Sequence, residues 1–107
     1  MYTRIVKTKV KAGRVQELRN VLNDQVLPLL KKQAGFVDML TLSATHDPQE
    51  LLSLSMWKNR EDAERYQRDQ YEKVQQMVSS LIEGQPEIQG CNVEFSTAYR
   101  IATGKAA

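Results

Sequence analysis

Few side chains in this 107-residue sequence are of the types that catalyse by themselves. The chain has one histidine, His46, and one cysteine, Cys91. His46 precedes an Asp-Pro step, where we expect a solvated turn residue rather than a general base. Cys91 reads as a small buried apolar residue rather than a nucleophile. One Cys and one His cannot supply the ligand set of a zinc or iron site, so the sequence predicts no metal.

The other candidates are polar or aromatic groups near a predicted helical stretch. Tyr66 and Tyr71 could hydrogen-bond a phenol or quinone oxygen while their rings form an apolar wall, and core packing fits them equally well. Gln76 can donate to and accept from a carbonyl group, but beside an apolar stripe we expect it to be solvated. We expect Trp57 to pack between a strand and a helix rather than to stack on a substrate.

The N-terminal third predicts a strand followed by a helix. Residues 2–10 alternate in character, and we place Tyr2, Val6 and Val10 on one side, with Arg4, Ile5, Lys7 and Lys9 on the other. From residue 14, apolar residues recur at spacings of three and four until Gly35, which predicts an amphipathic helix of about five turns. Pro28 should kink that helix or end it early, because it lacks a backbone donor.

The remainder predicts a hairpin, a second helical region and a last strand. Residues 36–43 and 51–57 read as the two strands of an antiparallel hairpin. Asn59 resembles a helix N-cap, and apolar residues continue at helical spacing, as one bent helix or two, until Gly84 and Pro86. Residues 91–101 alternate strictly and predict the final strand, and we expect the tail at 102–107 to be loose.

This order of elements predicts a fold. Strand, helix, strand, strand, helix, strand is the α+β, ferredoxin-like βαββαβ arrangement, in which helices cover one face of a four-stranded antiparallel sheet. Both hairpin strands carry apolar residues on both faces, so the uncovered face should be apolar too. A symmetric homodimer that packs this open face on itself would cover it. We expect one domain over residues 1–107 with a core from about residue 3 to 101.

The composition argues against several classes of partner. The net charge is +2 and the basic residues are interspersed with acidic ones, which argues against nucleic acid. The central strands offer Leu, Met and Ser rather than the aromatic and basic residues of RNA-binding sheets. The apolar runs are too short for a membrane span and the N-terminus lacks a signal sequence, so we expect a cytoplasmic protein.

Three stretches in order resemble the antibiotic biosynthesis monooxygenase family of dimeric α+β barrels. They are the Val-Lys-Ala-Gly-Arg sequence at 10–14, the Gly-Phe step at 35–36 and the Trp-containing segment at 56–63. The resemblance runs from about residue 3 to 100. It implies a homodimer with a substrate cleft between helices and sheet. Several members oxidise quinols or polyketide phenols with O₂ and no cofactor, so the resemblance also implies that no cofactor is needed.

Other members cleave haem, and that activity is disfavoured here. The haem-degrading branch is similar in using an Asn, a Trp and a His at positions that correspond to Val6, Tyr66 and Gln76. None of the three matches, and a glutamine amide is a poor axial ligand. Quinol-oxidising members often carry histidines where Tyr66 and Tyr71 stand in this sequence.

Two functions therefore remain open. The first is a cofactor-independent monooxygenase that acts on a small aromatic phenol or quinol with O₂. The second is a non-catalytic homodimer that binds a small ligand or serves as an accessory protein on the same fold. For both, the predicted pocket residues are Val6, Trp57, Tyr66, Tyr71 and Gln76, and no catalytic residue is assigned.

Overall fold

The computed structural model describes residues 1–101, and its strands and helices alternate in the order expected of a ferredoxin-like α+β fold. The predicted tail at 102–107 lies outside the described residues. The elements are β1 (Tyr2–Val10), α1 (Val15–Val21), a π-helical turn η1 (Leu22–Val26), α2 (Leu27–Lys31), β2 (Phe36–Ser43), β3 (Glu50–Trp57), α3 (Arg60–Asp69), α4 (Tyr71–Val78), a 3₁₀ turn η2 (Ser79–Leu81) and β4 (Ile82–Asn92).

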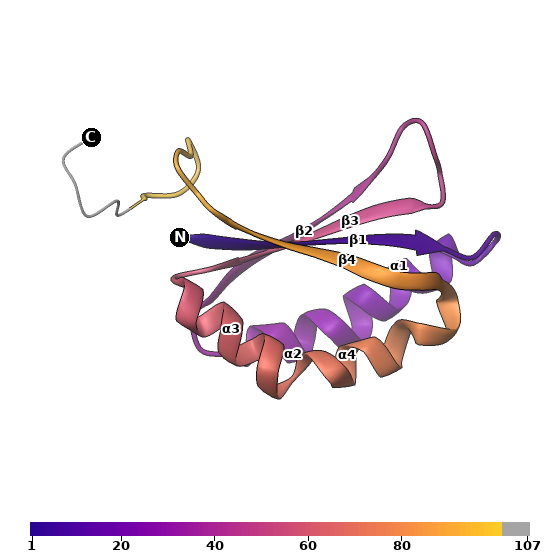
Figure 1. Cartoon of the computed structure of the whole chain (residues 1–107), viewed down its shortest axis with the longest axis horizontal. Coiled ribbons are helices and arrows are strands. Elements are labelled where there is room, and N and C mark those ends of the chain that lie inside the picture. Colours follow the sequence, from indigo (N-terminus) through magenta and orange to yellow (C-terminus); the bar gives the residue numbers. More distant parts are fainter. Residues whose placement is uncertain (102–107) are drawn as a thin grey trace.

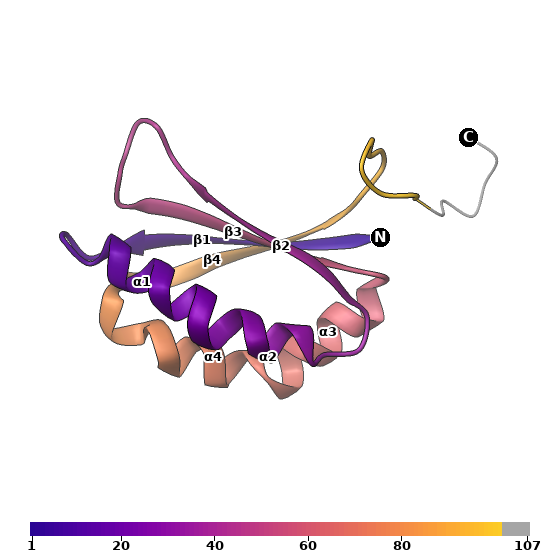
Figure 2. The same ribbon diagram turned by 180° about the vertical axis from the view of Figure 1, so that it is seen from behind.

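The strands form one four-stranded sheet in the order β2-β3-β1-β4, and every neighbouring pair is antiparallel. All helices lie on one face of the sheet, and in the described chain no helix covers the other face (Figures 1 and 2). The predicted fold class is therefore confirmed. We call the uncovered side the open face.

The side chains of β1 alternate strictly, which corrects the expected position of Arg4. Arg4 has the same parity as Tyr2 and Val6, and its side chain lies 4.8 Å from the ring centre of Tyr71 on α4, so it faces the helices. Placing it on the same side as Ile5 and Lys7 was wrong, because the two-residue period of a strand sets the face of a side chain whatever its charge.

The first helical region continues past Pro28 rather than ending there. Its irregularity precedes the proline, as the π-helical turn Leu22–Val26, and α2 resumes with Pro28 in its first turn. The wider turn has a physical cause, since a proline has no N–H and its ring crowds the carbonyl group four residues earlier. The helix thus keeps its apolar face on the sheet, with Leu18, Val26 and Leu30 all buried.

The second helical region is two helices, one of the two arrangements that the sequence left open. The Asn59 side chain accepts a hydrogen bond of 2.9 Å from the backbone N–H of Asp62, which confirms the predicted N-cap of α3. Gln70 separates α3 from α4. The break turns the chain so that Tyr66 and Tyr71, on either side of it, are both buried against the sheet.

The predicted last strand is wrong in position. We expected it at residues 91–101, but β4 spans Ile82–Asn92 and pairs with β1 from the Val10–Ile82 end to the Tyr2–Asn92 end. All of β1 is then paired, so within the described chain residues 93–101 have no strand edge to continue along. Pro86 is tolerated because β4 is an edge strand, and Gly84 takes a φ of 67° at the bulge.

The core between sheet and helices consists of two clusters. One is built around Trp57, which is 0% exposed, with residues of α2, α3 and α4, and the other around Val10, with residues of α1, β3, α4 and η2. None of the helices among residues 1–101 is long and apolar enough to cross a membrane.

Candidate functional site

A small cavity lies between the sheet and the helices, where the two core clusters meet. Its volume is about 70 Å³. The wall is apolar on the helix side, and the sheet contributes most of the polar groups. The residues that line it include Arg4, Val6, Ser55, Tyr66, Tyr71 and Gln75. We call this space the central cavity.

A row of aromatic rings forms one end of the site. Phe36 meets Trp57 edge to face at 5.6 Å, and Trp57 stacks on Tyr66 at 5.1 Å with 30° between the ring planes. Tyr66 in turn meets Tyr71 edge to face at 6.3 Å. Such geometries stabilise aromatic pairs beyond the area that they bury. Contact with Trp57 and with each other thus holds the rings of Tyr66 and Tyr71 in place.

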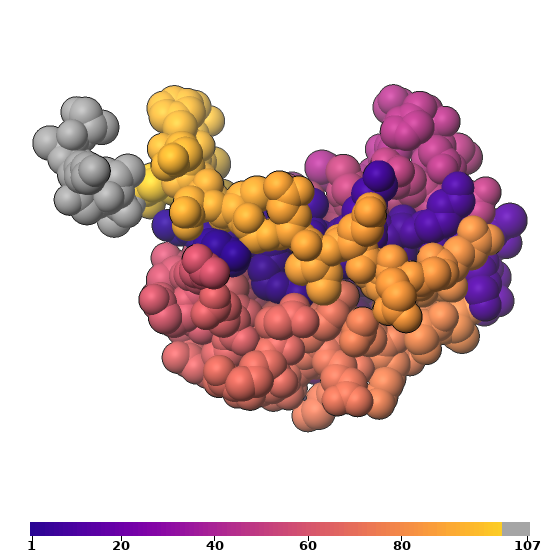
Figure 3. Space-filling model, viewed as in Figure 1, coloured from indigo at the N-terminus to yellow at the C-terminus, as the bar shows by residue number. Residues whose placement is uncertain are grey.

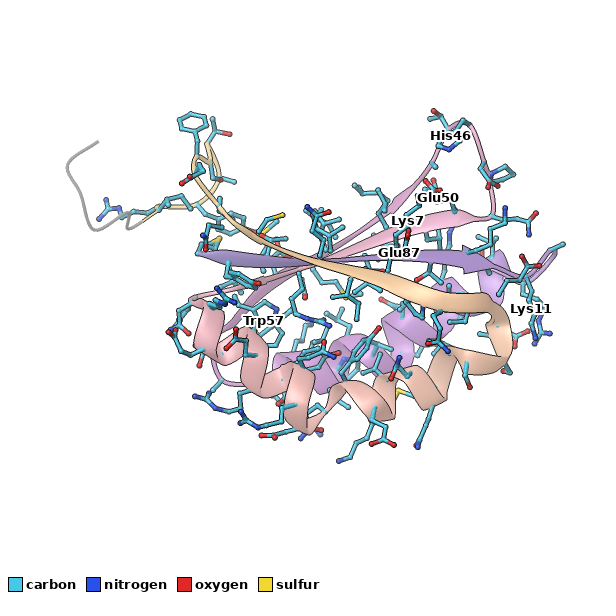
Figure 4. All side chains as sticks on the ribbon, in the orientation of Figure 1. Lys7, Lys11, His46, Glu50, Trp57 and Glu87 are labelled. Carbon is cyan, nitrogen blue, oxygen red and sulfur yellow. The ribbon has the colours of Figure 1, made fainter. Side chains whose placement is uncertain are left out.

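Trp57 supports Tyr66 from within the core and offers no surface to a ligand. It is fully buried, and its indole N–H donates a hydrogen bond of 2.9 Å to the hydroxyl of Ser55. Figure 4 shows Trp57 between the sheet and the helices, on the covered face. Its polar group is already satisfied, and the residue does not line the central cavity.

Arg4 is the one charged residue in the wall of the central cavity among residues 1–101. It is only 5% exposed, and its guanidinium carbon lies 5.1 Å from the ring centre of Tyr66 and 4.8 Å from that of Tyr71. Both distances fall within the range of cation–π attraction. Its Nη2 donates a hydrogen bond to Oε1 of Gln67 on α3.

Burial shifts the pKa values of the two tyrosines and of Arg4 in opposite directions. Burial raises the pKa of Tyr66 to about 12, against a smaller lowering by the positive charge of Arg4. Burial likewise raises the pKa of Tyr71. Burial lowers the pKa of Arg4, although a guanidinium remains charged in any physiological medium. At neutral pH the site therefore presents two neutral phenols, which can donate hydrogen bonds, and one cation.

A second, more open pocket reaches Arg4 from the edge of the sheet. It has a volume of about 290 Å³ and lies between β1, β4 and α3, with walls from Tyr2, Arg4, Ala63, Glu64, Gln67, Ile88 and Gly90. Figure 3 shows atoms of β1 exposed in a hollow between β4 and the α3–α4 helices. We call it the edge pocket. Arg4 lines both spaces and so lies between them.

The structure brings three of the five predicted pocket residues together. Val6, Tyr66 and Tyr71 line the central cavity, and Trp57 supports Tyr66 from behind. Gln76 does not reach it, since that side chain is exposed and lines an outer groove near Gly84 and Pro86. Its neighbour on α4, Gln75, is the glutamine that lines the cavity.

Other groups with chemical potential lie away from the cavity. His46 is exposed in the β2–β3 connection, on the open-face side of the sheet in Figure 4, with Nε2 3.9 Å from a Glu50 oxygen. Cys91 is half-buried in β4. Within the described ranges, no group of three His, Cys, Asp or Glu side chains could hold a metal ion.

Sequence reasoning missed Arg4. The signal that could have found it was its parity, because the alternation of β1 puts residues 2, 4, 6 and 10 on one face. A charged residue between apolar neighbours on the buried face of a strand is unusual, since a buried charge is costly unless it has a partner.

Comparison with known proteins agrees with this geometry. A family model described as antibiotic biosynthesis monooxygenase matches residues 1–77, which span β1 through most of α4. The chain belongs to this family. The match covers most of the elements that build the central cavity, and the resemblance of the sequence to the family is confirmed. No curated protein matches the chain.

Solved structures of similar fold include members with known chemistry. A conserved protein from Methanosarcina mazei is 25% identical with a TM-score of 0.70, over 85% of this chain and 91% of that one. The ActVA-Orf6 monooxygenase of Streptomyces coelicolor, solved with the ligand nanaomycin D, is 16% identical with a TM-score of 0.76, over 89% and 88%. SnoaB, a cofactor-independent oxygenase from Streptomyces nogalater, is 13% identical with a TM-score of 0.75, over 92% and 97%. At the two lower identities the likeness shows a shared fold.

Proposed function

We propose that the protein is a cofactor-independent monooxygenase that oxidises a small aromatic phenol or quinol with O₂ in the central cavity. One observation carries the proposal: two buried tyrosines line an apolar cavity between sheet and helices. The family and the similar fold of the Streptomyces oxygenases support the class of reaction.

The chemistry requires little of the protein. The phenol or its keto tautomer loses a proton, and the resulting anion gives one electron to O₂. The radical pair combines to form a carbon–oxygen bond, and the peroxide takes up a proton. The hydroperoxide then loses water, so that a ring CH₂ or CH becomes a carbonyl group. One oxygen atom enters the product and the other leaves as water, with O₂ as the only oxidant. The substrate supplies all of the electrons.

The residues in the wall supply orientation and a dry environment. With its pKa near 12, Tyr66 stays neutral and acts as a hydrogen-bond donor rather than as a base. Tyr71, whose pKa is also raised, plays the same part. A donor aimed at a substrate oxygen stabilises the negative charge that builds up there, and exclusion of water strengthens that interaction.

The size of the central cavity sets a condition on this function. Its volume of about 70 Å³ is smaller than the roughly 150 Å³ of an apolar cavity that binds benzene. An aromatic substrate therefore requires side chains to move aside as it binds. The small volume is also the observation that favours the second function, a non-catalytic ligand-binding or accessory dimer on the same fold.

We further propose that two copies of the chain pair through the open face. Leu40 and Leu42 on β2 are each 44% exposed there, and their neighbours Leu52 and Leu54 on β3 are only partly covered. Self-association of an apolar, self-complementary face removes it from water in both subunits at once.

Oxygen consumption tests the proposed reaction. The purified, metal-stripped protein is offered a panel of reduced naphthoquinols and anthrones, beside its Tyr66→Phe and Tyr71→Phe variants. The expected result is uptake in proportion to protein concentration, reduced by about tenfold or more in at least one variant. Uptake no faster than autoxidation across the panel would instead favour the binding function.

A further inference from the structure

We infer that the ligand reaches this site through the edge pocket and binds as an oxyanion on the guanidinium of Arg4, which lines both spaces, in the place now taken by the amide oxygen of Gln67. The inference rests on the proposed function for the idea that the ligand is oxidised. The recognition of negative charge stands on separate observations and is tested separately.

The first observation is that Arg4 is buried with no counter-ion among the residues that the structure describes. None of the ion pairs of these residues includes Arg4, and the side chains that it hydrogen-bonds, Gln67 and Tyr71, are neutral. The faces of Tyr66 and Tyr71 offer only partial compensation for a full charge. A buried cation in this condition favours any anion that can reach it.

The second observation is that an anion can reach Arg4. The guanidinium lines both the edge pocket and the central cavity, so a ligand in the edge pocket contacts it without unfolding the core. The volume of about 290 Å³ exceeds the roughly 150 Å³ that accommodates a benzene ring. Tyr2, Ala63 and Ile88 supply apolar wall for such a ring.

The acidic residue of the edge pocket does not neutralise Arg4. Glu64 lines the same pocket, but its Oε1 accepts a hydrogen bond of 2.6 Å from Nε of Arg60, one turn away on α3. Its charge is therefore already paired at the rim. The described residues that line the edge pocket therefore give Arg4 no free carboxylate partner.

The third observation is that the partner of Arg4 is easily displaced. Gln67 lies on α3 with an exposed side chain, so it can turn into solvent at small cost when a ligand oxygen arrives. An anionic oxygen adds the attraction of opposite charges to its hydrogen bond with a guanidinium, and the two oxygens of a carboxylate can accept from it together, which a single amide oxygen cannot do. The amide oxygen of Gln67 thus occupies the position in which a ligand oxygen would accept from Arg4.

Arg4 in this role would also favour the reactive form of the substrate. A positive charge within about 4–6 Å lowers the pKa of an acidic group by roughly 1–3 units. A phenol or enol bound at Arg4 would therefore ionise at a lower pH than in water, and the anion is the form that gives an electron to O₂. No general base in the cavity is required for that step.

Binding of a matched pair of unreactive ligands tests the inference. The probes are 2-naphthoate and its neutral amide, 2-naphthamide, titrated calorimetrically at neutral pH. Neither is a substrate for oxidation, so the result does not depend on turnover. We expect the wild-type protein to bind the anion about tenfold more tightly than the amide, the effect of one charge-assisted hydrogen bond.

Two variants at one surface position separate charge from structure. Gln67→Glu gives Arg4 an internal carboxylate, which should reduce the preference for the anion to about twofold or less. Gln67→Met has a similar length but no charge and no amide oxygen, so it should keep or increase the preference. Arg4→Met should abolish it, with circular dichroism to check that the variant is folded.

Equal affinity for the two probes, failure of both to bind, or a preference that Gln67→Glu leaves unchanged would overturn the inference. Those outcomes are distinguishable from failure of the proposed function. Oxidation of neutral phenols without anion preference would leave the monooxygenase in place, and anion preference without oxygen uptake would leave an anion-binding protein.

Discussion

At the scale of the residue, the raised pKa values of the hydroxyls of Tyr66 and Tyr71 limit the chemistry of the site. A group that is hard to ionise cannot accept a proton from a substrate, and Tyr66 and Tyr71 both have raised pKa values because they are buried. With neutral phenols beside a guanidinium, the site resembles a receptor for negative charge rather than a proton-transfer centre.

The raised pKa of Tyr66 predicts a loss of stability in alkali. The unfolded chain ionises this phenol near pH 10 and the folded chain near pH 12, so the free energy of unfolding should fall as the pH rises between these values. Tyr66→Phe removes that contribution, and its decline over the interval should be smaller by about 2 kcal/mol. Urea unfolding at a series of pH values measures both curves. Parallel curves would show that the phenol is not protected by burial.

At this scale the sequence revealed residue types but not their surroundings. Tyr66 and Tyr71 could be chosen because phenols suit the chemistry, and both line the central cavity. Gln76 was placed through the spacing of the family resemblance, whereas the stripe of Tyr71, Val74 and Val78 puts Gln75 on the buried side, since one residue along a helix is a rotation of about 100°. Arg4 was missed because it was grouped with the lysines of β1.

At the scale of the elements, the connection between α2 and β2 holds the site's aromatic end in place. Gly35 has a φ of 80°, and a side-chain carbon there would overlap the carboxylate of Asp62 on α3. Its carbonyl oxygen accepts a hydrogen bond of 2.8 Å from the backbone N–H of Lys58. The turn thus joins the start of β2 to the end of β3, next to Phe36 and Trp57.

Two glycine substitutions, one at this turn and one in the β1–α1 connection, separate the cost of backbone strain from the cost of steric overlap. Gly13 also has a positive φ, of 77°, but the space around it is empty, so Gly13→Ala should cost only the backbone strain of about 1–2 kcal/mol. Gly35→Ala adds the overlap with Asp62 and should cost at least about 1 kcal/mol more. Chemical denaturation of the two variants compares them. Equal losses would mean that Asp62 moves away freely.

The elements were largely predictable, and the exception has a physical cause. The hairpin strands and the N-cap at Asn59 follow from local patterns, which need only the residues themselves. The last strand does not, since its position depends on which residues β1 has free to pair. Gly84 and Pro86 were interpreted only as the end of the preceding helix, but an edge strand tolerates them. A side chain at Gly90 would meet the phenol of Tyr2, which would have to turn aside.

At the scale of the whole molecule, the open face is the surface through which we propose that two copies pair. Its leucines lie beside a charged end, where Lys7 contacts Glu50 at 3.5 Å and Glu87 at 3.8 Å (Figure 4). Phe95, beyond β4, is 81% exposed. Such an apolar surface in a small protein is typical of an interface.

The proposed dimer predicts the effect of a single charge. Leu40→Glu places a carboxylate on the open face, where the residue is already half exposed, so the subunit should stay folded while the dimer dissociates. Sedimentation should then report a mass near 12.2 kDa instead of twice that value. Lys73→Glu, exposed on α4 of the covered side, is the matched control and should leave the mass unchanged. A wild-type protein that sediments as a monomer at micromolar concentration would contradict the pairing.

The most direct test of the central claim follows the oxygen atoms. The metal-stripped protein is incubated under ¹⁸O₂ with the best substrate of the quinol and anthrone panel, and the product is analysed by mass spectrometry against a sample without protein and one with Tyr71→Phe. A monooxygenase reaction in the central cavity predicts one labelled oxygen per product molecule, formed at a rate proportional to the protein concentration and slowed in the variant. Labelling at the rate of the protein-free sample would contradict it and leave the chain as a binding protein.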